Sequence, residues 1–213
     1  MSLFGLSPNQ VAARVRAFGQ QARPLTMGQS FLFGAIGFCL ASLLVFATVA
    51  FGERWMYRHL GLTGSYVAWT LLFIGLGGGV LSRLVIGPGR LARFYFLFSV
   101  AFLAYAVGWV GAYFTLHGRA GESLGAFVGC TLMGLILAWA FGSMRSAIKI
   151  ISFLFVGNYV GYFAGDFLNN WWRGKLGMLS WGIAFGLGLG AGLSWALYFA
   201  QSPARELLNR NQD

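Results

Sequence analysis

Six long apolar stretches, separated only by short polar segments, constrain this chain more than any other feature. Each is about twenty residues long, which as a helix is enough to cross the ~30 Å hydrocarbon core of a bilayer. They are Ser30–Phe51, Tyr66–Ile86, Phe94–Leu116, Leu124–Phe141, Ile148–Phe167 and Leu179–Ala200. The sequence therefore predicts an all-α integral membrane protein, a compact bundle of six transmembrane helices joined by short loops.

The composition agrees with a membrane protein and leaves no stretch for a separate soluble domain. Only 9% of the residues are charged, against about a quarter in soluble domains. We divide the chain into an N-terminal amphipathic interfacial segment at 1–27, a transmembrane domain at 28–201 and a polar C-terminal tail at 202–213.

The N-terminal segment is basic and contains no acidic residue. Within Pro8–Gln21, Val11, Val15 and Phe18 recur at helical spacing, with arginines beside them. This pattern predicts a short helix that lies in the membrane interface. The same composition is also typical of a mitochondrial presequence, so that alternative stays open.

The basic residues are distributed unevenly between the two sides that six crossings would create. One side holds Arg14, Arg16, Arg23, Arg83, Arg90, Arg93, Arg145, Lys149, Arg205 and Arg210. The other side holds Arg54, Arg58, Arg119, Arg173 and Lys175. Ten against five places both termini on the inside. The net charge of +10 is thereby explained by topology, and we expect no binding to nucleic acid.

Aromatic residues collect near the ends of the stretches that face outward. They are Trp55, Tyr57, Tyr66, Trp69, Tyr113, Trp171, Trp172 and Trp181. Such a belt is typical of the boundary between hydrocarbon and water.

The fifth stretch carries two stripes at four-residue spacing, which place their members along one helix face. The first stripe is Gly157, Gly161 and Gly165, and the second is Asn158, Tyr162 and Asp166. Small residues permit close helix contact in membranes, so the glycine stripe predicts packing. The polar stripe runs from the middle of the span to its outer end and predicts either a solute path or polar recognition of a neighbour.

Glycine is abundant, with 32 residues, and the sixth stretch repeats the same spacing at Gly182, Gly186 and Gly190. We predict that these glycines pack the sixth span against the fifth as a hairpin, in the manner of a glycine zipper. Runs such as Gly75–Gly79 resemble phosphate-binding loops, but they lack the strand and turn that such loops need.

The third stretch has an aromatic face, on which Tyr105, Trp109 and Tyr113 recur every fourth residue and His117 follows. A face of this kind can line a site for a hydrophobic ligand such as a quinone, a carotenoid or a lipid tail. Plain packing between helices is the competing interpretation. We predict no required cofactor beyond such a ligand.

Catalytic and metal sites have little support in the sequence. Cys39 and Cys130 both lie in apolar stretches, where a thiol acts as a small hydrophobe. His59 and His117 fall on the outer side, but neither has a ligand partner at three- or four-residue spacing. We therefore predict no metal site and no enzymatic activity.

Two function hypotheses follow. No ionisable residue lies deep within a span, which favours a non-catalytic accessory or structural subunit of a larger, energy-transducing membrane complex. This subunit would contact partner subunits and lipid in a bacterial or mitochondrial inner membrane. The alternative is a small-solute or ion transporter, a channel, or a membrane-embedded substrate-binding component that uses Asn158, Tyr162 and Asp166.

Overall fold

The computed structural model describes residues 3–18 and 25–210, which form seven α-helices and contain no strand. The helices are α1 (Pro8–Ala17), α2 (Met27–Leu81), α3 (Arg90–Leu116), α4 (Gly118–Ala140), α5 (Ala147–Trp172), α6 (Gly174–Ala200) and α7 (Ser202–Asn209). Short 3₁₀ turns lie at Ser82–Leu84 and Met144–Ser146. In the described part of the chain, α2 to α6 are the five helices long and apolar enough to cross a membrane. The chain is a multi-pass helical membrane protein in contact with the lipid bilayer.

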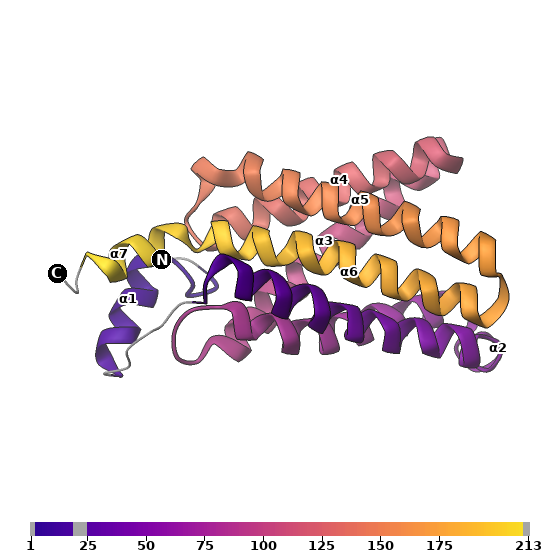
Figure 1. Cartoon of the computed structure of the whole chain (residues 1–213), viewed down its shortest axis with the longest axis horizontal. Helices are drawn as coiled ribbons and strands as arrows, with labels where there is room; N and C mark the ends of the chain where they lie inside the picture. The colour runs from indigo at the N-terminus through magenta and orange to yellow at the C-terminus, as the bar shows by residue number, and fades with distance from the viewer. Residues whose placement is uncertain (1–2, 19–24, 211–213) are drawn as a thin grey trace.

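Helix α2 folds back on itself, so it contains the first predicted stretch and most of the second, which ends beyond Leu81. Gly61 has φ 68° and ψ −177°, a conformation that is not helical and that glycine adopts easily. The first limb of α2 (residues 27–60) then packs against the second limb (residues 62–81). Phe38 and Phe73 stack across them with ring centroids 6.1 Å apart. Figure 1 shows α2 turning back at the end opposite the two termini.

The chain is built from three consecutive helical hairpins with tight turns: the two limbs of α2, then α3 with α4, and α5 with α6. The turns contain Gly61, His117–Gly118 and Arg173–Gly174, all at positive φ. A second glycine follows each turn glycine by three residues, at Gly64, Gly121 and Gly177. We call this end of the bundle the hairpin end.

Both termini lie at the opposite end, which we call the terminal end (Figure 1). There Val11, Ala12 and Val15 of α1 pack against Ala204 and Leu208 of α7. The predicted short helix is present, and its valines pack against α7; its place in the membrane interface stays a prediction. Two predicted features, the arginine at Arg23 and the helix end at Gln21, lie outside the described residues.

Polar contacts tie the hairpins together at the terminal end. Gln201 donates from Nε2 to the carbonyl oxygen of Leu84 at 3.1 Å and accepts from the backbone N–H of Ile86 at 2.8 Å. The Arg14 guanidinium donates to the carbonyl oxygen of Gly5, and burial, with the nearby charge of Arg93, lowers the pKa of Arg14. Gln201 thus joins the end of α6 to the segment after α2, and Arg14 joins α1 to the residues before it.

Helix α6 lies between α5 and α2, and it meets each through a separate row of small residues. On the α5 side, a Cβ atom at Gly161 would lie 2.9 Å from the carbonyl oxygen of Ala184, and one at Gly192 would lie 2.6 Å from that of Phe153. Helices α5 and α6 therefore touch backbone to backbone. Gly157 contacts Gly188 and Gly192 in this row, and Gly165 lies against the ring of Trp181.

The predicted partner of the other glycine row in α6 is wrong. Gly182, Gly186 and Gly190 face the first limb of α2, not α5. A Cβ atom at Gly186 would lie 2.7 Å from the Cα of Cys39, and one at Gly190 would lie 2.8 Å from the carbonyl oxygen of Gly34. The three glycines do pack helices closely. The glycines of α6 that contact α5 are Gly188 and Gly192, which lie on a different face of α6.

Candidate functional site

An aromatic cavity of about 420 Å³ lies in the half of the bundle nearer the hairpin end. Both limbs of α2, helix α3 and helix α6 form its walls, and Tyr162 reaches it from α5. Its aromatic lining comprises Phe46, Tyr57, Tyr66, Trp69, Phe73, Phe102, Tyr105, Trp109, Tyr162, Trp181 and Phe185. Glu53 is the one charged side chain among the lining residues. The cavity suits an apolar molecule that carries one or a few polar groups.

One buried hydrogen bond sets the position of Tyr105 in the cavity wall. The Tyr105 hydroxyl donates to Oδ1 of Asn158 at 2.9 Å, and Asn158 is fully buried. The Asn158 amide nitrogen has no hydrogen-bond partner. Burying an amide N–H₂ without a partner costs free energy. The Tyr105–Asn158 pair therefore stands out among the apolar side chains around it.

Trp69 adds a second unpaired donor, and it lies in the lining itself. Its side chain is 8% exposed, and its indole nitrogen has no hydrogen-bond partner. The ring is held by edge contacts to Tyr57 and Tyr66, with centroids 5.8 and 5.4 Å away. Trp69 therefore gives the cavity wall an indole N–H that has no acceptor among the described residues.

The aromatic face predicted on the third stretch is divided between the cavity and the helix packing. Tyr105 and Trp109 line the cavity, whereas Tyr113 stacks on Trp109 at 5.3 Å without lining it. Close packing with α4 supports this face, because Gly129 and Gly125 lie against Tyr105 and Trp109. The glycine row of α4, which sequence reasoning did not single out, has the same four-residue spacing as those of α5 and α6.

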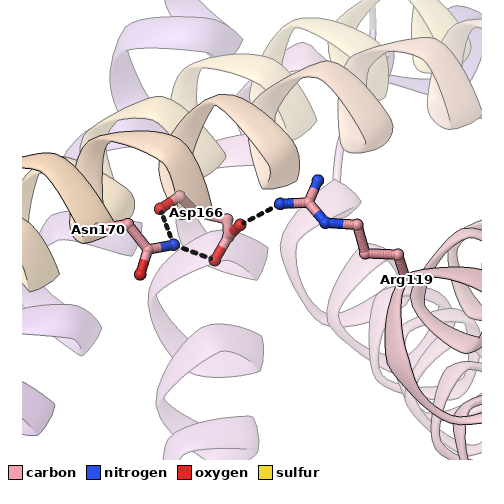
Figure 2. Close-up of polar contacts among 3 residues, drawn as sticks. All are labelled: Arg119, Asp166 and Asn170. Carbon is pink, nitrogen blue, oxygen red and sulfur yellow. Dashed lines mark hydrogen bonds and ion pairs between the residues drawn. The ribbon is translucent and has the colours of Figure 1, made fainter.

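The predicted polar stripe does not line one continuous cavity. Asn158 is buried behind Tyr105, Tyr162 lines the aromatic cavity, and Asp166 lies farther out. Figure 2 shows Asp166 between two partners. Arg119 of α4 forms an ion pair with it at 3.6 Å, and Asn170 donates to its Oδ1 at 3.1 Å.

Sequence reasoning missed several residues of the cavity that lie in α2, on both sides of its turn at Gly61. The sequence analysis placed Tyr57, Tyr66 and Trp69 in the aromatic belt, and it did not single out Glu53. The signal that could have identified them is the spacing of Tyr66, Trp69 and Phe73, which places three aromatic rings on one helix face.

The histidines considered as metal ligands lie apart in the structure. His59 stacks on Trp55 with ring centroids 4.6 Å apart, and His117 occupies the turn between α3 and α4. Among residues 3–18 and 25–210, no group of three or more His, Cys, Asp or Glu side chains is placed to hold a metal ion.

No family model matches this chain, and neither a curated protein nor a solved structure matches it.

Proposed function

We propose that the protein is a non-catalytic membrane component that binds a small, largely apolar molecule in the aromatic cavity. The observation that carries this proposal is a cavity of about 420 Å³ with eleven aromatic side chains in its lining, among them Trp69, whose indole N–H is unpaired. Ligand cavities in proteins typically measure about 300–1,000 Å³ and combine apolar walls with a few polar groups. The aromatic cavity has both properties.

The polar lining favours one class among the ligands that the aromatic face suggested. A carotenoid hydrocarbon or a lipid tail would leave the Trp69 N–H without an acceptor. A quinone ring offers carbonyl oxygens to that donor and a flat face for stacking between aromatic side chains. The proposed ligand is therefore a lipophilic ring compound with carbonyl groups.

We also infer that the chain crosses the membrane six times, with both termini on the inside. The break at Gly61 and the packing of the α2 limbs support two crossings within α2. Among the described residues, the terminal end carries the larger set of basic side chains, and proteins retain such charge on the inner side. The aromatic cavity then lies in the outer half of the membrane.

The burial pattern gives little support to ion-coupled transport. The polar residues buried in the described chain are serines, Asn158 and Gln201, and none of them is charged. Coupling to an ion or proton requires ionisable groups inside the bundle. A binding role fits this interior better than a transport role.

Membership of a larger energy-transducing complex stays a prediction, as does residence in a bacterial or mitochondrial inner membrane. A mass-spectrometric inventory of the chains that co-purify tests it. Recovery of defined partner chains in fixed ratio would support the subunit hypothesis. A homogeneous preparation of this chain alone would oppose it.

The binding proposal is tested by filling the cavity. Ala106 lines it, so Ala106→Trp should abolish saturable binding of a short-chain benzoquinone to the protein in nanodiscs, with at least a tenfold loss of affinity. Leu103→Trp is the matched control, because Leu103 lies on the same helix and is 48% exposed. Equal affinity of wild type and Ala106→Trp would refute the proposal.

The ligand class is tested by removing the unpaired donor. Trp69→Phe should lower benzoquinone affinity about two- to tenfold, which is the worth of one neutral hydrogen bond. Binding of an alkylbenzene of the same size, which has no carbonyl, should fall less. Trp171→Phe is the control, since Trp171 is 73% exposed. An equal loss of affinity for both ligands would mean that Trp69 contributes packing but no hydrogen bond to the ligand.

A further inference from the structure

A second hollow of about 690 Å³ runs along the outside of α2, between its two limbs. We call it the α2 groove. It shares no lining residue with the aromatic cavity. Five apolar side chains of the first limb that line it are each more than half exposed: Leu32, Phe33, Ile36, Leu40 and Leu44. Gly37 lies between them and lets Val80 of the second limb approach closely, which makes the floor of the groove.

The α2 groove is apolar along its length and polar at one end. Arg83 and Gln29 line it at the terminal end of the bundle. Arg83 is exposed, and no hydrogen bond or ion pair joins it to another residue in the described ranges. The Gln29 side-chain oxygen accepts from the backbone N–H of Thr26 at 3.1 Å, which leaves its amide N–H₂ for another acceptor. A cation and an amide donor thus both line the polar end of the α2 groove.

The length of the groove fits one lipid tail. Gln29 and Leu44 are 15 residues apart, or roughly 22 Å at 1.5 Å per residue. Half of a ~30 Å hydrocarbon core is only about 15 Å thick, so an acyl chain that starts at the terminal end can follow the groove through its whole leaflet.

We propose that the α2 groove binds one phospholipid with an anionic headgroup, from the leaflet at the terminal end. An acyl chain lies between the limbs of α2, and the headgroup phosphate accepts hydrogen bonds from Arg83 and Gln29. Arginine suits phosphate because its planar guanidinium presents paired donors. Basic pockets beside transmembrane helices select anionic over zwitterionic headgroups by charge.

The headgroup is tested by lipid competition. Wild-type protein in detergent is incubated with equal amounts of phosphatidylglycerol and phosphatidylcholine, and the bound lipid is counted by native mass spectrometry. We expect one phosphatidylglycerol to be retained in preference, and Arg83→Gln to reduce that preference about fivefold. Arg145→Gln, an exposed arginine at the same end that does not line the groove, should keep it. Equal retention of both lipids by wild type, or an unchanged preference in Arg83→Gln, would overturn the proposal.

The tail is tested by blocking the groove. Leu40→Trp should release the retained lipid whatever its headgroup, whereas Leu103→Trp should not. Full lipid occupancy in Leu40→Trp would overturn the assignment to this groove. A lipid-free dimer of wild type that Leu40→Trp converts to monomers would instead mean that a second copy fills the groove.

Discussion

Two helix contacts in this bundle differ in what lies between the backbones. Helices α5 and α6 meet through Gly161, Gly188 and Gly192, and their backbones touch. Toward the hairpin end, the second limb of α2 and helix α3 instead contribute Trp69 and Trp109 to the wall of the aromatic cavity. The size of the residues along a contact thus determines whether two membrane helices close completely or leave space.

The contact between α2 and α3 is closely packed at one end and leaves space at the other. Near the terminal end, Tyr95 lies over Gly78 and its hydroxyl donates to the carbonyl oxygen of Gly75. Farther along, Phe73 and Phe102 stack with centroids 5.8 Å apart, and beyond them the cavity begins. The glycine run 75–79 is therefore a packing element, and the cavity opens where glycine gives way to aromatic side chains.

The largest expected effect follows from adding a side chain to the closed contact. A Cβ atom at Gly161 would lie 2.9 Å from the Ala184 carbonyl oxygen, and neither backbone can move aside easily. We expect Gly161→Leu to destabilise the protein by about 3 kcal/mol or more, which lowers Tm in detergent by roughly 10 °C.

The matched control for this change is Gly111→Leu in α3, because a Cβ atom at Gly111 meets nothing within 4 Å. Its Tm should stay close to that of wild type. Thermal unfolding followed by circular dichroism measures both variants. If the two leucines had the same effect, close backbone contact would not distinguish the α5–α6 interface from any other helix surface.

A smaller effect is expected where the cavity wall is fixed by a hydrogen bond. Tyr105→Phe leaves the buried Asn158 side chain without its partner and should cost about 1–2 kcal/mol, or roughly 2–8 °C in Tm. The double variant Tyr105→Phe/Asn158→Leu removes both polar groups and should recover at least half of that loss. Additive losses in the double variant would show that Asn158 is stabilised by something other than Tyr105.

Much of the fold could be predicted because span length and helical spacing are local properties of the sequence. The spans, the close α5–α6 hairpin and the packing role of the glycine stripes follow from them. The neighbour that each stripe meets does not. Helix α6 has glycines on two faces, and four-residue spacing cannot tell whether Gly186 meets α2 or α5.

The candidate site was harder to predict because its residues come from four helices. Spacing within α3 identified Tyr105 and Trp109, which line the cavity. It could not indicate that Trp69 of α2 and Tyr162 of α5 complete the same wall, since that depends on how three hairpins pack. Asn158 was singled out only as a member of the polar stripe, and its hydrogen-bond partner is Tyr105, 53 residues earlier in the chain.

The smallest expected effect concerns the ion pair at the hairpin end, which tests whether packing or charge holds the hairpins together. Arg119 is 79% exposed, so water and salt screen its attraction to Asp166. Arg119→Gln should change stability by less than about 1 kcal/mol, a Tm shift under roughly 3 °C. The shift should shrink further in 0.5 M salt, with Arg58→Gln as a control for simple loss of an exposed charge. Because Asn170 still donates to Asp166 in this variant, the carboxylate keeps a partner. If Arg119→Gln lost as much stability as Gly161→Leu, the ion pair at the hairpin end would determine how closely α4 and α5 approach. The size of the buried residues would then not determine it.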